Sequence, residues 1–361
     1  PEDELPAAGQ AVAGVSVPVL QGLQFDSRRA QVQQARLVNQ INEVERQKMM
    51  NDLMLAAVEA YWNWAYAAEA VAVFENAVDL AVQNFNNTKE SFLQGDKPAI
   101  DTVEVATQIQ DRQISLADAR VEFENTTLFL SNFLWDENDN PLRVSSYVLP
   151  AGLEQGPMID PSFSIPTILN NPSIIPDLQS IRLKQNSLDI KERLKREMLK
   201  PRLDVEYNFL ADGFDFFNPP SGEDSNQLNA LVTENYKWAV NFSFPILLRR
   251  ERAGLELVRL EQIQTQYKYN NKRLDIQNKV NAIQQQLETT QDQIQLAETA
   301  IENYSRLLEA ENIKFRIGES SIFLLNSREQ KLIDAQLKLL KLEAKVLKLQ
   351  AKVQAALGQL R

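Results

Sequence analysis

Hydrophobic positions recur with two different periods along this chain. Between residues 252 and 317 an apolar residue returns every seven positions, and a second apolar row lies between the first. This spacing predicts a coiled-coil seam on one long helix. The segment holds no proline, and Gly254 is its only glycine before Gly318. About 66 residues at about 1.5 Å each give a helix roughly 100 Å long. The rows are Val280, Leu287, Ile294, Ile301, Leu308 and Phe315, with Ile283, Ala297 and Tyr304.

Residues 22 to 94 have the same long-helix pattern. Each long helix ends at a glycine, Gly95 or Gly318, which suits a left-handed position just past a helix C-terminus. A second helix follows each glycine, so both glycines are predicted to be the tips of antiparallel hairpins. The predicted N-cap signals of these second helices are Asp96 with Pro98, and Ser320 or Ser321.

Three segments alternate instead with period two, namely residues 11–18, 201–210 and 236–245. Alternation predicts strands with one apolar and one polar face. Such strands suit a membrane barrel with a watery lumen, and they suit a soluble sheet with one buried face equally well. If a membrane surrounds them, the lipid-facing residues are Leu203, Val205, Tyr207, Phe209, Trp238, Val240, Phe242 and Phe244.

The order of strand, long helix, glycine and helix occurs twice. Residues 92–110 align with residues 315–333 at an offset of 223 positions. We therefore expect a first repeat over residues 1–135, an irregular proline-rich connector over 136–171, and a second repeat over 172–361. The second repeat contains a helix from 172 to about 199, a β-hairpin over 201–245 with a long loop, a helix over 248–317 and a helix over 319–358. The two shorter helices together nearly equal the long one, so we expect them to lie end to end beside it.

Composition removes several function classes. The chain has no cysteine and no histidine, which excludes disulfides, Cys/His or Ser/His catalysis and the usual zinc ligands. No phosphate-binding glycine loop is present, and the formal net charge of −11 argues against a nucleic-acid partner. We expect no catalytic residue, no metal and no cofactor. No apolar window is long enough for a transmembrane helix. No signal peptide precedes Pro1, so we expect that one was removed or that the sequence is trimmed.

The chain resembles the TolC-like outer-membrane efflux proteins. The matching motifs are VSVPVL and FSFPIL, AYW at residues 60–62, FLQGDKPAIDTVEVA and FRIGESSIFLLNSREQ at the two tips, NFLW and AALG at the helix ends, and PSIIPDLQSIRLKQNSLDI followed by LKPRLDVEYNF. Together they extend from residue 11 to residue 361.

The resemblance implies a mainly α protein with a small β part, in which three chains form a twelve-stranded outer-membrane barrel continuing into a long periplasmic α-helical barrel. It implies a passive exit duct of a tripartite efflux or type I secretion system. The partners would be two further copies, a periplasmic adaptor, an inner-membrane transporter of the RND or ABC type, and outer-membrane lipid. The family has four strands per chain and this sequence shows three. We expect the missing helix and strand to lie before this sequence, with residues 1–10 as the remainder of a loop.

The resemblance also assigns roles to the tips. Gln94, Gly95, Ile317 and Gly318 would contact the adaptor. The charged residues Asp96, Asp101, Glu104 and Glu319 would line the periplasmic entrance and its gate, with Lys97 as a counter-charge. In the second repeat, Leu324 and Ser327 replace the acids Asp101 and Glu104, so we expect no acidic ring there. All of these residues also have a structural explanation, as helix ends and first-turn acids.

Three alternatives remain at this point. A soluble coiled-coil scaffold explains the heptads but leaves the aromatic strands without a purpose. A helical pore-forming toxin explains the length but requires no tandem repeat. An enzyme requires a polar cluster in a pocket, and the sequence shows none. The sequence does not identify the transported substrate, the transporter class or the resting state of the gate.

Overall fold

The computed structural model describes residues 10–145, 148–153, 175–212 and 236–360. This part of the chain is mainly helical with one small antiparallel sheet, as the two hydrophobic periods predict. In chain order the elements are β1 (Gln10–Pro18), α1 (Ser27–Leu93), α2 (Ala99–Ser131), α4 (Pro176–Glu197), β2 (Arg202–Asp212), β3 (Tyr236–Ser243), α6 (Arg249–Arg316) and α7 (Ile322–Ala356).

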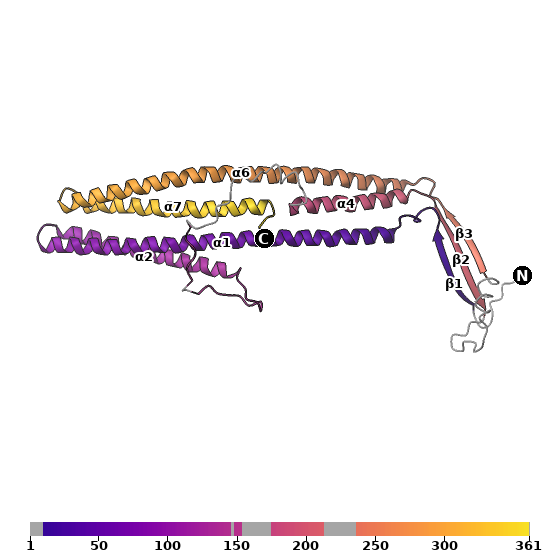
Figure 1. Ribbon diagram of the computed structural model, residues 1–361, viewed down its shortest axis with the longest axis horizontal. Coiled ribbons are helices and arrows are strands. Elements are labelled where there is room, and N and C mark those ends of the chain that lie inside the picture. Colours follow the sequence, from indigo (N-terminus) through magenta and orange to yellow (C-terminus); the bar gives the residue numbers. More distant parts are fainter. Residues whose placement is uncertain (1–9, 146–147, 154–174, 213–235, 361) are drawn as a thin grey trace. The chain divides into compact units, whose positions relative to one another are not determined.

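The two long helices form as the heptad rows predict. Helix α1 has 67 residues and α6 has 68, so each is about 100 Å long. Helix α2 folds back along α1, and α7 folds back along α6 (Figure 1). The order strand, long helix, shorter helix therefore occurs twice, as β1–α1–α2 and as β3–α6–α7. The repeat boundaries at residues 135 and 172 stay a prediction.

Several predicted element bounds need correction. Helix α1 begins at Ser27 rather than near residue 22, because residues 21–25 form turns and bends. Strand β3 ends at Ser243, so Phe244 lies outside the strand to which it was assigned. Most of the predicted connector, at 146–147 and 154–171, lies outside the described residues. The loop predicted over 211–234 begins too early, because β2 continues to Asp212, and its remainder lies outside the described residues.

The chain divides into two compact units, each built from segments distant in sequence. The first unit comprises residues 1–45 and 177–272, which include the sheet, α4 and the first parts of α1 and α6. Helix α4 lies along α6 in this unit. Lys191 Nζ lies 2.8 Å from Glu261 Oε2, and Gln262 Nε2 donates to Asp189 Oδ1 over 2.8 Å. The first part of α6 therefore has α4 as its neighbour, as the length argument predicts.

The sheet of the first unit has the order β1–β2–β3, with both strand pairs antiparallel. Its register places the predicted apolar residues directly opposite one another, with Leu203 opposite Phe242 and Tyr207 opposite Trp238. Opposite residues share a face of an antiparallel sheet. The apolar residues from Leu203 to Phe209 and from Tyr236 to Phe242 therefore share one face with Val15 and Val17. Asp204, Glu206 and Asn208 lie on the other face, which also carries Val12 and Leu210.

A close backbone approach on the polar face explains one glycine. Gly14 lies opposite Asn208, and a methyl group at Gly14 would come within 1.8 Å of Asn208 Oδ1. Any larger residue at this position would displace the Asn208 side chain or the strand. The register of β1 on β2 thus depends on a residue with no side chain.

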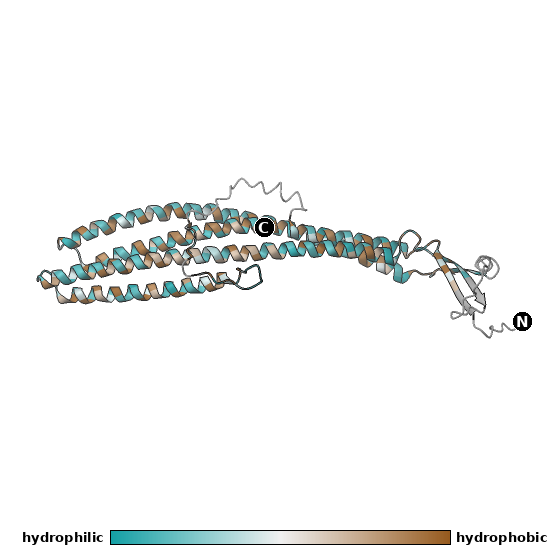
Figure 2. Cartoon of the chain, turned by 60° about the horizontal axis from the view of Figure 1, so that its bottom comes forward, coloured by the Kyte–Doolittle hydropathy of each residue, from teal (hydrophilic) through white to brown (hydrophobic). Residues whose placement is uncertain are grey.

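The second unit comprises residues 46–176 and 273–361 and contains the two helical hairpins. Its core consists of small clusters along the helices, such as Trp62, Ala65 and Leu347 in one and Trp64 with Leu130 in another. Figure 2 shows apolar and polar residues alternating along the helices. None of the helices in the described ranges combines the length and apolar character needed to cross a membrane.

Candidate functional site

The two hairpin tips in the second unit have the same backbone turn. Gly95 has φ of +85° and Gly318 has φ of +79°, both in the left-handed region that favours glycine. Asp96 N donates to Ser91 O over 3.0 Å, and Glu319 N donates to Lys314 O over 2.8 Å. These are the hydrogen bonds of a Schellman motif, which closes a helix C-terminus. The predicted role of both glycines in ending the long helices is confirmed.

The helices that leave the two turns are capped differently. Ser321 accepts a hydrogen bond from Leu324 N, so one of the two predicted serines is the N-cap of α7. Helix α2 begins after Pro98, which has extended backbone and provides no side-chain cap. The prediction that Asp96 caps α2 is therefore wrong, because the turn places Asp96 two residues before Pro98. Asp101 lies in the first turn of α2, where a negative charge faces the positive end of the helix dipole.

A cation–π contact joins the two tips. Lys97 Nζ lies 2.9 Å from the centroid of the Phe315 ring, which belongs to the end of α6. Partial burial lowers the pKa of Lys97, and the nearby Asp101 carboxylate opposes that shift. Lys97 thus contacts the second hairpin and lies near the predicted gate residue Asp101. The role of Lys97 as a counter-charge at the gate stays a prediction.

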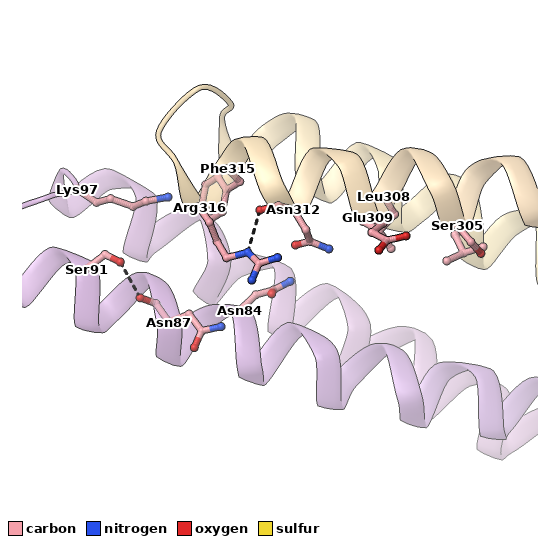
Figure 3. Close-up of a pocket in the computed structure, with 11 residues that line it drawn as sticks. Asn84, Asn87, Ser91, Lys97, Ser305, Leu308, Glu309, Asn312, Phe315 and Arg316 are labelled. Carbon is pink, nitrogen blue, oxygen red and sulfur yellow. Dashed lines mark hydrogen bonds between the residues drawn. The ribbon is translucent and has the colours of Figure 1, made fainter.

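A polar groove lies between α1 and α6 beside these tips (Figure 3). Its volume is about 510 Å³, and its walls carry amide, hydroxyl and charged groups from both long helices. Arg316 Nε donates to Asn312 O over 3.4 Å along one wall. The residues that line it include Asn84, Asn87, Ser91, Lys97, Ser305, Glu309, Asn312, Phe315 and Arg316.

Apolar side chains from both hairpins hold the tips together. Val105 of α2 is buried against Ile322 and Leu325 of α7, each at most 2% exposed. Phe85, Leu308 and Phe315 pack against this cluster. The tips are therefore one packed region within the second unit.

A buried polar layer follows the apolar cluster and was not predicted from sequence. Glu329 of α7 is 4% exposed and accepts hydrogen bonds from Asn84 Nδ2 of α1 at 2.6 Å and from Gln108 Nε2 of α2 at 3.4 Å. Arg112 of α2 is also buried and donates to Gln330 of α7. Burial raises the pKa of Glu329, whereas the hydrogen bond from Asn84 and the charge of Arg112 oppose that shift. Burial likewise lowers the pKa of Arg112.

A sequence signal for this layer existed. Arg112 lies seven residues after the buried Val105, and Glu329 lies seven residues after the buried Ile322. A charged residue at a seam position predicts a buried polar contact between helices. The heptad rows predicted from sequence contain only apolar residues, so neither Arg112 nor Glu329 was expected to be buried.

The predicted entrance residues are all found at the tips. Gln94, Gly95, Asp96, Gly318 and Glu319 are exposed in the two turns, and Ile317 is 64% exposed. Asp101 and Glu104 are partly exposed on α2. Among the four predicted gate acids, Asp101 lies close enough to Lys97 for its charge to act on the pKa of that lysine. Their role in gating stays a prediction.

The apolar face of the sheet is exposed in the single chain. Trp238 is 66% exposed, Phe242 is 65% exposed and Val240 is 50% exposed, although each lies opposite an apolar partner on β2. Large exposed apolar patches of this kind indicate contact with a membrane or a partner. Phe209 is part of β2, and the structure describes its backbone only.

Comparison with known proteins agrees with these features. The outer membrane efflux protein family matches residues 174–359, just over half of the chain. Among solved structures, the Campylobacter jejuni CmeC outer membrane channel has a TM-score of 0.67 at 16% identity and covers 97% of this chain and 77% of its own. The outer membrane protein VceC from Vibrio cholerae has a TM-score of 0.72 at 12% identity, and the match covers 97% of this chain and 86% of the VceC chain. The open state of the Neisseria gonorrhoeae MtrE outer membrane channel has a TM-score of 0.67 at 15% identity, and the match covers 99% of this chain and 81% of the MtrE chain. No curated protein matches the sequence.

The fold is that of an outer-membrane channel with long helical hairpins. The chain belongs to the outer membrane efflux protein family. It is an outer-membrane exit duct for efflux, with helices that extend into the periplasm. The sequence-based predictions of the family, the mainly helical fold, the efflux function and the outer-membrane location are confirmed.

Proposed function

We propose that three copies of this chain form one passive duct whose helical tips receive a periplasmic adaptor, and that an inner-membrane transporter of the RND or ABC type supplies the energy. A type I secretion system is the other assembly that this arrangement serves. The chain itself would carry out no chemical reaction. In the described ranges, no group of three or more acidic, histidine or cysteine side chains is placed to hold a metal ion.

The observation that carries the proposal is the exposed apolar face of a three-stranded sheet attached to helices about 100 Å long. A membrane-spanning strand must satisfy its backbone hydrogen bonds, so the sheet must close on itself. Three strands are too few to close a barrel, because the smallest such barrels have eight strands. Closure therefore requires strands from several chains, with lipid covering Trp238, Val240 and Phe242.

The outer face of the first unit offers a further reason for assembly. An apolar row on α6 is exposed in the single chain, and its members are Leu257, Leu260, Ile263 and Tyr267, between 53% and 65% exposed. On α1, Val32 is 53% and Val38 is 48% exposed. Exposed apolar residues on two different helices suit a head-to-tail contact between copies, which closes into a ring.

The tips fit adaptor docking for two reasons. A side chain placed at Gly95 or Gly318 would meet no atom within 4 Å, so both turns are open to a partner. The neighbouring Leu93 and Ile317 are 73% and 64% exposed, and they offer apolar contacts beside the glycines. A helical partner would contact both exposed glycines directly through their backbones.

The experiment is native mass spectrometry of the protein extracted from membranes in detergent, combined with photo-crosslinking in cells. We expect a mass of three chains. A photo-crosslinker at Gln94 or Ile317 is expected to trap a co-expressed, tagged adaptor. The same crosslinker at Gln291, which is exposed on α6 many helical turns away from Gly318, is the control and should trap none. A monomeric mass would refute the duct, and equal trapping at all three positions would refute tip docking.

A further inference from the structure

The outward face of α2 carries two parallel rows. Ile114, Val121 and Leu128 recur every seven residues and are 61%, 57% and 57% exposed. Glu104, Asp111 and Asp118 form an acidic row with the same spacing, three residues before positions 107, 114 and 121. Residues three apart are neighbours on a helix surface. An apolar row flanked by one sign of charge is how a helix contacts a coiled-coil partner.

A groove with the complementary pattern lies between α6 and α7. Its volume is about 360 Å³, and Leu296, which is 71% exposed, is one of the apolar residues that line it. On the α7 side the exposed Lys331, Lys338 and Lys345 recur every seven residues. Within the described part of the chain these three ammonium groups have no carboxylate partner. The groove is lined by Gln293, Leu296, Ala297, Ala300, Tyr304, Lys331, Asp334, Ala335 and Lys338.

We propose that the α2 face of one copy of this chain docks in the α6–α7 groove of the next copy. The apolar row of α2 would cover Leu296, and its acidic row would face the lysine row of α7. This proposal rests on the proposed three-copy duct and names the surfaces that join the copies. Because the α2 face and the groove are different surfaces, each copy contributes one of each, and the contact closes into a ring.

The positions along the helices agree with this contact. A ring with its rotation axis along the helices places all hairpin tips at one end, so the height of a residue can be counted along its helix from the tip glycine, Gly95 or Gly318. On this count Leu296 of α6 falls between Ile114 and Val121 of α2. The apolar rows therefore interdigitate.

The charged rows also interdigitate at this register. Counted from the tip glycines, Asp111 falls between Lys331 and Lys338 in height. Asp118 falls in the same way between Lys338 and Lys345. Each aspartate thus lies between two lysines. Asp334 lies at the level of Asp111, but its Oδ1 already accepts a hydrogen bond from Gln330 Nε2 over 2.7 Å.

Contacts inside one chain leave this face of α2 free. Helix α2 meets its own α7 through Val105, Gln108 and Arg112, all on its inward face. Asp111, Ile114 and Asp118 point away from that contact and are exposed. The pairing of the acidic and lysine rows therefore needs a second chain.

Because the chain has no cysteine, an engineered pair tests the contact without background. The double variant Val121→Cys with Leu296→Cys is oxidised in detergent with copper phenanthroline and analysed on a non-reducing gel. We expect a covalent trimer as the major band. The matched control is Val121→Cys with Gln295→Cys, since Gln295 is exposed on α6 at nearly the same height but on another face. This control should remain monomeric on the gel.

A charge swap provides an independent measurement. Lys331→Glu with Lys338→Glu is expected to lower the melting temperature of the trimer, and adding Asp111→Lys with Asp118→Lys is expected to restore it. Absence of a covalent trimer band, or lack of rescue, in a protein whose native mass is that of a trimer would overturn this contact alone. A native mass of one chain would overturn the duct itself. If the added Asp111→Lys and Asp118→Lys changes restored the melting temperature of a protein with the native mass of one chain, the charged rows would pair inside one chain, and the proposal would be refuted.

Discussion

The two hairpins of this chain share a backbone but differ in charge. Both tips form the same left-handed glycine turn, at Gly95 and at Gly318. Beyond the turns, Asp118 and Glu122 of α2 correspond through the offset between the repeats to Lys341 and Lys345 of α7. Asp111 instead corresponds to another acid, Asp334, so the two repeats differ in charge at some exposed positions and agree at others.

The difference shows which features the fold constrains. A turn with positive φ requires glycine wherever it occurs, so both repeats retain it. Exposed positions on α2 and α7 carry no such constraint, and their charges differ without cost to the hairpin. A tandem repeat with opposite charges at some exposed positions supplies two complementary surfaces on one chain, which a ring of copies requires.

The largest expected effect concerns the apolar cluster that joins the tips. Leu325→Ala removes a side chain that is 1% exposed and should lower the free energy of unfolding by about 2–5 kcal/mol. The neighbouring Leu324→Ala, at a position 43% exposed, should change it by less than about 1 kcal/mol. Denaturant titration of the helical circular dichroism signal in detergent measures both. Equal effects would show that the tips are not packed together.

The next effect tests whether the two turns are equivalent. Gly95→Ala and Gly318→Ala should each cost about 1–2 kcal/mol, because alanine is strained at positive φ. Gly254→Ala is the control, since Gly254 lies inside α6 and an added methyl group would meet only the Lys195 side chain, at 3.6 Å. That change should stabilise the protein by up to about 1 kcal/mol. A large loss of stability at one tip and none at the other would show that the two turns are not equivalent.

The contact between Lys97 and Phe315 should contribute a smaller amount. A double-mutant cycle of Lys97→Met with Phe315→Leu is expected to give a coupling energy of about 0.5–1 kcal/mol. Lys97→Arg should retain most of it, because a guanidinium also stacks on an aromatic ring. A coupling energy of zero would mean that this contact does not link the hairpins.

The smallest effect is a change in the pH dependence of stability. Burial raises the pKa of Glu329 above its ordinary 4.5, so the folded state holds the proton at higher pH than the unfolded state, and stability falls as pH rises from about 4.5 through the folded pKa. The groups that contact Glu329 or act on its charge are Asn84 of α1 and Gln108 and Arg112 of α2.

A second glutamate gives the opposite sign and serves as the control. The Ser320 hydroxyl, with Arg328, holds the pKa of Glu311 below 4.5, so its contribution is present above pH 4.5 and is lost as pH falls through the folded pKa. Glu329→Gln should flatten the loss of stability above pH 4.5, and Glu311→Gln should flatten the loss below it. Unfolding titrations from acidic to mildly alkaline pH compare the two. Unchanged slopes in Glu329→Gln would show that its carboxyl titrates normally.

Much of this fold could be predicted from sequence because the responsible signals are local or periodic. Heptad rows without proline predict the long helices, and glycines between such rows predict the tips. Alternation in residues 201–210 and 236–245 predicts both the strands and their apolar face. The predicted ends of helices and strands were less accurate, as Phe244 and Asp96 show. Hydrogen bonding, and not the hydrophobic period, decides where a strand ends or a helix begins.

The contacts between hairpins could not be predicted in the same way. Arg112 and Glu329 interrupt apolar rows, yet only the packing of three helices shows that both are buried and which amides they contact. The Lys97–Phe315 contact joins residues from different repeats, and no local pattern relates them. The candidate gate residues lie at or near the turns because the sequence places them there, whereas their contacts depend on the tertiary structure and their role in gating stays a prediction.

The most direct test of the duct is single-channel conductance of the full-length protein, purified in detergent and inserted into planar lipid bilayers. A duct of three copies predicts stable conductance steps, and if Asp96, Asp101, Glu104 and Glu319 line the entrance as proposed, the steps should favour cations. Asp101→Asn should then change the step size or the cation preference. A protein that inserts as a trimer and yields no conductance, or a water-soluble protein that does not insert, would contradict the account.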